Sequence, residues 1–342
     1  MRIRVTGGCG FIGSNFIEYV LQHDTDAVIC NVDKLTYAGN PANLAGIERE
    51  CSDRYNFEKA DIADPVAMRR IFVELGIEAV VNFAAESHVD RSITDAGPFI
   101  HSNVSGVQNL LSLALEFSVA RFVHVSTDEV YGSLSIEDGG KGFTEQSPLA
   151  PNSPYAASKA AADLMCRAWH ETYGFPVVVT RCSNNYGPRQ FPEKLIPFMY
   201  SKATRDESLP VYGDGRNVRD WIHVKDHCRG VYLALTKGRG GAVYNFGGSA
   251  ERSNIEVVRA ILEFCEKPET LVRFVKDRPG HDRRYAMDFS LATEELGFTP
   301  GFEFGQGLRE TLEWYRDNQD WMDNITSGAY LSFMRDWNGE RV

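Results

Sequence analysis

A tyrosine and a lysine stand four positions apart in the segment YAASK at residues 155–159. On a helix, this spacing places Tyr155 and Lys159 on one face. A phenol is too weak an acid to serve as a base near neutral pH, but a neighbouring ammonium lowers its pKa. The pair can therefore support hydride transfer at a carbinol. The spacing is also common by chance, and without further context it indicates only a surface Tyr–Lys pair.

The segment STDEVYG at residues 126–132 places two adjacent carboxylates beside a threonine. It follows a predicted strand over 121–125, and open parallel sheets hold their ligands at the carboxyl ends of their strands. Thr127 can hydrogen-bond a reacting hydroxyl, while Asp128 and Glu129 can divide an acid step and a base step between them. The structural alternative is a capped helix with both acids in its first turn.

A glycine-rich turn, GGCGFIG at residues 7–13, follows a predicted strand and opens a predicted helix. In this context Gly7 permits the tight turn, Gly10 lets the backbone approach a pyrophosphate, and Gly13 allows the helix to pack closely on the strand. The free N–H groups of the helix then face the phosphates. The turn therefore predicts a dinucleotide site. Cys9 replaces the usual small residue and is expected to make the turn mildly sensitive to oxidation.

Acidic residues follow the second and third predicted strands. Asp33 lies twenty residues after Gly13, where a carboxylate can accept hydrogen bonds from a ribose diol. The same carboxylate would repel a 2′-phosphate, so the sequence favours NAD over NADP, although Lys34 weakens this preference. Asp61 and Ile62 stand where an adenine edge is expected, and a helix-capping role for Asp61 is equally consistent with the sequence.

The element pattern is that of parallel βαβ units. Short apolar runs predict strands over 3–6, 27–32, 55–58, 79–83, 121–125 and 177–180, and longer amphipathic runs predict helices that include 66–75 and 104–116. We therefore predict an α/β fold with a Rossmann-type, doubly wound parallel sheet. Residues 1–183 would form the NAD-binding domain, with about 220–231 and 242–246 returning to it. Residues 184–342 would mainly form a smaller, C-terminal lobe that binds substrate.

Composition excludes several classes of protein. The 342 residues carry a net charge of −11, which argues against a nucleic-acid partner because such binding needs a basic surface. No apolar run approaches the length of a membrane span. The seven cysteines are scattered without a C-x-x-C pair, which argues against a disulfide framework or a zinc site. A cytoplasmic protein without a bound metal is expected.

Five further blocks carry a family resemblance: VDKLTYAGN, AAESHVDRSI, STDEVYG, NNYGPRQFPEKLIP and DRPGHDRRYAMD. With the glycine turn and the Tyr–Lys pair, the chain resembles the extended short-chain dehydrogenase/reductases and, within them, the dTDP-glucose 4,6-dehydratases. The blocks span nearly the whole chain in the expected order. The resemblance implies an NAD-dependent hydro-lyase of deoxysugar biosynthesis that acts on a nucleoside-diphosphate hexose as a homodimer.

The resemblance also implies a role for each catalytic residue. Tyr155 would take the C4 hydroxyl proton of the sugar, with Lys159 and Thr127 assisting. Glu129 would remove the C5 hydrogen, and Asp128 would protonate the departing C6 hydroxyl. The product would be a 4-keto-6-deoxy sugar nucleotide and water, with no net consumption of NAD.

Binding residues follow from the pattern and the resemblance together. The predicted NAD-binding residues are Gly7, Gly10, Phe11, Ile12, Gly13, Asp33, Lys34, Asp61, Ile62, Ala84, Ala85, Ser102, Tyr155, Lys159 and Asn185. The implied substrate-binding residues are Ser87, Thr127, Asn184, Lys194, Leu195, Arg219, Asn254, Arg278 and His281. Arginine side chains suit a diphosphate because they bind it through two parallel hydrogen bonds. The alternatives are surface ion pairs for the arginines and an orienting role for His281.

Four other functions are compatible with the fold class. A 4-epimerase or a decarboxylase would share the cofactor site, but such relatives usually lack the Asp–Glu pair after the threonine. A UDP-sugar 4,6-dehydratase would differ only in base preference, because one methyl group discriminates modestly, by about 1–3 kcal/mol. A catalytically silent NAD-binding protein would not need Thr127, Tyr155 and Lys159.

Overall fold

The computed structural model describes residues 1–135, 141–277 and 280–325. Its main feature is a parallel sheet of seven strands in the order β10-β6-β5-β4-β1-β2-β3. The strands are β1 (Arg2–Thr6), β2 (Val28–Asp33), β3 (Tyr55–Lys59), β4 (Ala79–Asn82), β5 (Arg121–Thr127), β6 (Val177–Cys182) and β10 (Val243–Phe246). The chain runs outward from β1 through β2 and β3, then crosses to β4 on the other side. This reversal opens a crevice at the carboxyl ends of β1 and β4. The predicted doubly wound α/β fold is confirmed.

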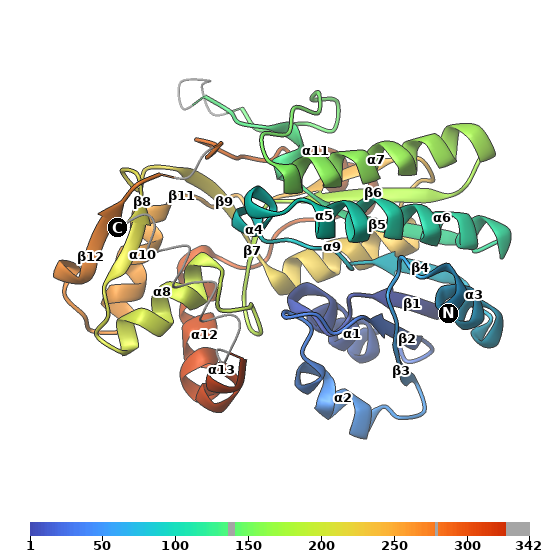
Figure 1. Ribbon diagram of the computed structural model, residues 1–342, viewed down its shortest axis with the longest axis horizontal. Helices are drawn as coiled ribbons and strands as arrows, with labels where there is room; N and C mark the ends of the chain where they lie inside the picture. Colours follow the sequence, from blue (N-terminus) through green and yellow to red (C-terminus); the bar gives the residue numbers. More distant parts are fainter. Residues whose placement is uncertain (136–140, 278–279, 326–342) are drawn as a thin grey trace.

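Helices cover both faces of this sheet (Figure 1). On one face lie α1 (Phe11–His23), α9 (Val224–Lys237) and α11 (Ser290–Leu296), and on the other lie α3 (Pro65–Leu75), α6 (Val107–Glu116) and α7 (Pro154–Tyr173). Because both faces are buried, the strands are nearly continuous apolar runs instead of alternating ones. Ile3 and Val5 of β1, for example, are fully buried.

The helix predicted over 104–116 is longer and irregular. It begins with α5 (Gly97–Phe99), continues as the π-helical segment η2 (Ile100–Gly106) and ends as α6. A π-helix widens the turn by one residue and often occurs beside a functional site. Ser102 and Asn103 lie on this segment. Hydrophobic periodicity did not reveal it, because one widened turn hardly changes the spacing of the apolar residues.

A second core lies beside the carboxyl edge of the sheet (Figure 1). Its strands form a three-stranded sheet in the order β11-β9-β7 and a parallel pair of β12 and β8. The strands are β7 (Asn184–Tyr186), β8 (Leu209–Tyr212), β9 (Val218–His223), β11 (Glu251–Ser253) and β12 (Val272–Val275), and the helices are α8 (Leu195–Thr204), α10 (Asn254–Phe264), α12 (Phe304–Asp317) and α13 (Gln319–Ile325). The helix α9 packs on α1, and β10 pairs with β6. The chain thus returns from the second core to the layers of the main sheet at these two elements.

The remaining elements are short. They are η1 (Pro41–Leu44), α2 (Ala45–Glu50), α4 (Val89–Thr94), η3 (Asp128–Tyr131) and η4 (Glu269–Leu271). Among the helices of the described ranges, none is both long and apolar enough to cross a membrane.

Replacing Gly13 by Ala should destabilise the fold, because the added Cβ would collide with the carbonyl oxygen of Gly7 and lie 2.8 Å from Gly8 Cα. We expect the free energy of unfolding in urea to fall by about 1–3 kcal/mol. Gly46→Ala is the matched control, because a Cβ there meets nothing within 4 Å. In helix α2 it should raise stability by up to about 1 kcal/mol. Equal effects at the two positions would contradict the steric explanation.

Candidate active site

A cleft runs along the carboxyl ends of the parallel strands, between the sheet and the second core. The loops that follow β1 to β6 supply most of its walls. All of the predicted catalytic and NAD-binding residues line it: Gly7, Gly10, Phe11, Ile12, Gly13, Asp33, Lys34, Asp61, Ile62, Ala84, Ala85, Ser102, Thr127, Asp128, Glu129, Tyr155, Lys159 and Asn185. The fold thus brings residues from three predicted motifs to one place.

The glycine turn closes one end of the cleft and fits a dinucleotide. Gly7 has φ +70°, and a Cβ there would lie 2.6 Å from the backbone nitrogen of Ala84. The helix α1 starts without a side-chain cap, so its first-turn N–H groups remain for a ligand. A side chain at Gly7 would collide with the backbone of Phe83 and Ala84, and one at Gly13 would collide with Gly7 and Gly8, so both glycines are needed for the turn to pack this closely.

Asp33, at the end of β2, stabilises the glycine turn through hydrogen bonds to the backbone. Its Oδ2 accepts a hydrogen bond from the backbone of Cys9 at 3.0 Å, and its Oδ1 accepts one from Leu35 at 2.8 Å. Burial raises the pKa of Asp33, and the two backbone hydrogen bonds oppose this effect. The expectation that Cys9 is sensitive to oxidation is wrong. Its side chain is 1% exposed, and burial raises the pKa of the thiol to about 12, so almost no reactive thiolate exists.

Asp61 stands at the far end of the same groove. Lys34 Nζ lies 2.6 Å and His101 Nε2 2.9 Å from its Oδ2. Partial burial raises the pKa of Asp61, but the hydrogen bonds from Lys34 and His101 outweigh this and lower it to about 2. The helix-capping alternative does not hold for Asp61, because Asp64 caps α3 by accepting from the backbone of Val66 at 2.9 Å.

Tyr155 and Lys159 lie near the start of α7, which Ser153 caps. Both are buried, with Tyr155 9% and Lys159 4% exposed, so they are not a surface pair. Burial and the nearby Glu129 raise the pKa of Tyr155, whereas a hydrogen bond with Thr127 lowers it. Burial lowers the pKa of Lys159. Lys159 Nζ donates to the backbone carbonyl of Val125 at 2.7 Å, which ties α7 to β5.

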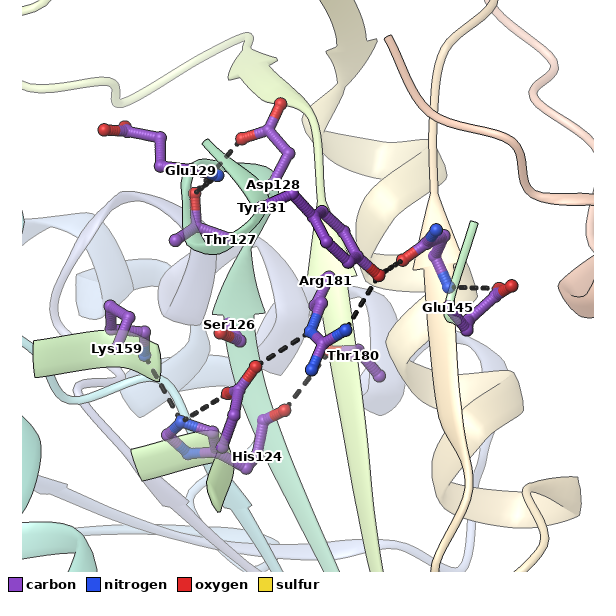
Figure 2. A network of polar contacts seen from close by, with 12 residues as sticks. His124, Ser126, Thr127, Asp128, Glu129, Tyr131, Glu145, Lys159, Thr180 and Arg181 are labelled. Carbon is purple, nitrogen blue, oxygen red and sulfur yellow. Dashed lines mark hydrogen bonds and ion pairs between the residues drawn. The ribbon is translucent and has the colours of Figure 1, made fainter. Parts of the chain in front are cut away.

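A buried polar network continues beneath Lys159 (Figure 2). His124 Nε2 lies 3.5 Å from Lys159 Nζ and 3.8 Å from Asp163 Oδ1. Asp163 Oδ2 accepts from Arg181 Nε at 2.8 Å, and Arg181 Nη1 donates to the hydroxyl of Tyr131 at 2.8 Å. Burial and the cation Lys159 keep the pKa of His124 well below its usual range, so the imidazole is neutral. The network therefore joins the helix of the Tyr–Lys pair to the turn that carries Asp128 and Glu129.

Thr127 is the last residue of β5, and Asp128 and Glu129 begin the turn η3 (Figure 2). Thr127 Oγ1 donates to Asp128 Oδ1 at 3.2 Å and accepts from the backbone of Glu129 at 3.3 Å. Burial, with a smaller contribution from Glu129, raises the pKa of Asp128 well above its usual range. The capping alternative and the catalytic prediction are therefore compatible: the turn is capped by Thr127, and both carboxyl groups line the cleft.

Similarity to known proteins agrees with this geometry. The sequence profile of the GDP-mannose 4,6 dehydratase family matches residues 5–311. A dTDP-glucose 4,6-dehydratase from Actinoplanes is 50% identical over 94% of this chain and 99% of its own. The dTDP-glucose 4,6-dehydratase 1 of Escherichia coli K12 is 47% identical over 98% of each chain. The chain belongs to the dTDP-glucose 4,6-dehydratase family.

Solved structures of related enzymes have the same fold. The dTDP-glucose 4,6-dehydratase DesIV of Streptomyces venezuelae, crystallised with NAD and TYD, superposes with a TM-score of 0.91 at 48% identity, over 95% of this chain and all of its own. A UDP-glucose 4-epimerase of Thermus thermophilus in complex with NAD reaches a TM-score of 0.84 at 30% identity, over 93% of this chain and 100% of its own. The fold is thus common to the dehydratases and to epimerases. The fold alone therefore does not distinguish the two reactions, and the side chains in the cleft must do so.

The substrate-binding residues that the family resemblance implies for this chain lie in two places, some in the cleft lining and others outside it. Ser87, Asn184 and Lys194 line the cleft with Thr127. Outside the lining lie Leu195 at the start of α8, Asn254 at the start of α10, Arg219 on β9, and His281. Arg219 is 5% exposed and donates to the carbonyls of Val218 and Asp282, while His281 lies 2.6 Å from Asp277. Arg278 is outside the described residues.

Glu193 is a cleft residue that the sequence analysis missed. Its Oε1 accepts from the hydroxyl of Tyr37 at 3.1 Å, and its Oε2 lies 3.7 Å from both Arg91 Nε and His88 Nε2. Burial raises the pKa of Glu193 to about 7, and the nearby cations oppose this effect. The available signal was an acid between Pro192 and Lys194 in a block that carried the family resemblance. Other cleft residues not predicted are Val32, Thr36, Ala38, Gly39, Ala60, Phe83, Glu86, Val125, Ser126, Cys182, Ser183, Gln190 and Phe191.

Glu193 should make stability depend on pH. Its pKa in the folded protein is about 7 against an ordinary value of 4.5, so the folded state binds more protons between these values. The contribution of protonated Glu193 to the free energy of unfolding is complete below pH 4.5 and is lost as the pH rises through 7. Relative to Glu193→Gln, the wild type should lose roughly 3 kcal/mol across this window, at about 1.4 kcal/mol per pKa unit. Urea unfolding of both proteins at several pH values measures the difference, and parallel profiles would show that Glu193 does not titrate there.

Proposed function

We propose that this chain is a dTDP-glucose 4,6-dehydratase that converts dTDP-glucose to dTDP-4-keto-6-deoxyglucose and water. One observation carries the proposal: a buried Tyr–Lys pair shares one cleft, beside a dinucleotide turn, with a buried Asp128 and a half-buried Glu129. A dehydrogenase needs only the first pair. The elimination of water from the C5–C6 bond needs an additional acid and base, and the second pair supplies them.

The chemistry that NAD would supply when bound is reversible hydride acceptance, from C4 of the sugar and back to C6. Gly7, Gly10 and Gly13 would admit its pyrophosphate, and Asp33 would bind a ribose. Asp61 and Ile62 would contact the adenine. The other proposed contacts are Phe11, Ile12, Lys34, Ala84, Ala85, Ser102, Tyr155, Lys159 and Asn185, all of which line the cleft.

Tyr155 would take the proton of the C4 hydroxyl as that carbon is oxidised. Burial raises the pKa of Tyr155, and the ammonium of Lys159 and a hydrogen bond with Thr127 would oppose this effect and favour the phenolate that the step requires. The resulting C4 carbonyl makes the C5 hydrogen acidic. Glu129 then removes it, and Asp128, whose pKa is raised by burial, protonates the departing C6 hydroxyl.

The sugar nucleotide would extend from this cleft toward the second core. Thr127, Ser87, Asn184 and Lys194 would contact the sugar and the diphosphate, and Leu195, Arg219, Asn254, Arg278 and His281 would hold the remainder. Residues 1–183, with 220–231 and 242–246, would thus serve as the NAD-binding domain, and most of 184–342 would serve as the substrate lobe.

The chain would work in the cytoplasm as a homodimer. Ile100 on η2 is 51% exposed and Leu164 on α7 is 56% exposed, and these two elements pack against each other. Large apolar side chains on adjacent exposed helices favour association with another copy of the chain.

The first test is incubation of the purified protein with dTDP-glucose, without added NAD, and measurement of the alkaline absorbance of 4-keto-6-deoxy sugars. We expect product, because the enclosed cleft should retain NAD during purification. UDP-glucose is the matched comparison for base preference. If no keto sugar forms from either compound even after NAD is added, the chain is not a 4,6-dehydratase.

Glu129→Gln and Tyr155→Phe should stop the reaction at different points. In Glu129→Gln the C4 proton still has an acceptor but the C5 proton does not, so absorbance of reduced cofactor should accumulate while turnover falls about 10²–10⁴-fold. In Tyr155→Phe neither reduced cofactor nor keto sugar should appear, because the C4 proton has no acceptor. Stopped-flow absorbance distinguishes the two. Turnover like that of the wild type in Glu129→Gln would exclude its role as the C5 base.

A further inference from the structure

The proton balance of the proposed dehydration leaves two groups in the wrong state after each turnover. The C4 oxygen remains a carbonyl in the product, so Tyr155 never returns the proton that it took. Asp128 has given its proton to the departing water. Glu129 can return the C5 proton to C5, so it neither gains nor loses one. One proton must therefore move from Tyr155 to Asp128 before the next substrate can react.

Thr127 lies between these two groups. Its hydroxyl donates to Asp128 Oδ1 at 3.2 Å, and the Tyr155 side chain lines the same cleft within hydrogen-bonding reach of Thr127. Figure 2 shows the Thr127 and Asp128 side chains next to each other at the end of β5. All three residues are at most 9% exposed. A hydroxyl can accept one hydrogen bond while it donates another, which is the requirement for passing a proton along a chain.

We propose that Thr127 is a proton shuttle that returns the C4 hydroxyl proton from Tyr155 to Asp128. The Tyr155 O–H bond breaks as a new bond forms to Thr127 Oγ1, and the original Thr127 O–H bond breaks as its proton binds Asp128 Oδ1. Tyr155 is left as phenolate, Thr127 is unchanged, and Asp128 is again a carboxylic acid. The shuttle rests on the proposed dehydration, and it adds a role for Thr127 beyond orienting the C4 hydroxyl.

The two oxygens of Asp128 are placed for this cycle. Oδ1 faces Thr127, whereas Oδ2 is buried and has no hydrogen-bond partner among the residues that the structure describes. No hydrogen bond from these residues therefore competes with a substrate hydroxyl for Oδ2. Burial and Glu129 hold the pKa of Asp128 well above its usual range, which favours the protonated acid that the shuttle restores.

The other polar path from the Tyr–Lys pair does not reach Asp128. From Lys159 it runs through His124 to Asp163, which is paired with Arg181 (Figure 2). A guanidinium does not give up a proton in proteins, so this path ends at Arg181. It can hold Lys159 in place, but it cannot restore the acid.

Thr127→Val removes the hydroxyl and nearly keeps the side-chain volume, and Thr127→Ser keeps the hydroxyl. In rapid-mixing experiments on the NAD-loaded enzyme, we expect Thr127→Val to form about one product per site and then to slow sharply, because Asp128 is not reprotonated. Added imidazole, as a small proton donor, should speed the slow phase in proportion to its concentration. Thr127→Ser should turn over repeatedly with no burst.

A role limited to orienting the C4 hydroxyl gives a different result. The first and later turnovers of Thr127→Val would then slow equally, with neither a burst nor an effect of imidazole, and that outcome would overturn the shuttle. NAD content and the KM for dTDP-glucose show whether the site is intact, and Thr127→Ala replaces the valine variant if the latter does not fold. If wild-type enzyme makes no keto sugar, the proposed dehydration itself fails, which is distinguishable from failure of the shuttle.

Discussion

The hydrogen bond from Lys159 Nζ to the backbone carbonyl of Val125 fixes the geometry on which the rest of the cleft depends. It joins α7, which carries the phenol, to β5, which ends at Thr127 and leads directly into η3, where both acids lie. An ammonium buried beneath the cleft has lost its hydration, and a charged hydrogen bond to a carbonyl replaces part of it. Since α7 cannot slide along β5 without breaking this bond, the distances among Tyr155, Thr127 and Asp128 are set by it.

Burial is the second constraint, and it acts on the acids and the cations in opposite directions. It raises the pKa of Asp128 and Glu193 and lowers that of Lys159 and His124. One cleft can therefore hold a carboxyl group with a raised pKa, that of Asp128, next to the less buried carboxyl group of Glu129. Asp163 and Arg181 lie in the same dry interior but compensate each other directly, at 2.8 Å. The network thus keeps charge near the reaction without leaving it unpaired.

Much of this arrangement could be predicted from the sequence, because it depends on local patterns. Hydrophobic periodicity and turn residues located the first six strands of the main sheet to within one or two residues, as for β2, which was predicted over 27–32 and is observed over Val28–Asp33. The short strands of the second core, β7, β8, β11 and β12, were not predicted. The glycine turn, the Tyr155–Lys159 spacing and the Thr127 segment needed only neighbouring residues for their interpretation. What could not be predicted depends on contacts between distant segments. Glu193 meets Tyr37 and Arg91, more than a hundred positions away, and its altered pKa arises from that enclosure. The π-helical turn and the hydrogen bond from the Arg219 guanidinium to the carbonyl of Asp282 could not be predicted for the same reason, since both depend on contacts between distant segments.

The late arrival of β10 has a consequence for biosynthesis. Until residues 243–246 leave the ribosome, β6 is an open edge strand, and Tyr131 lacks Asn245, whose side chain accepts its hydroxyl at 2.8 Å. A nascent chain can form the dinucleotide half of the sheet early, because β1 to β6 and their helices are already present. The exposed edge could meanwhile pair with another nascent chain. The turn η3 thus gains this support only after residue 245 has been synthesised, more than a hundred residues after the turn itself, so the cleft is completed late relative to the strands that carry it.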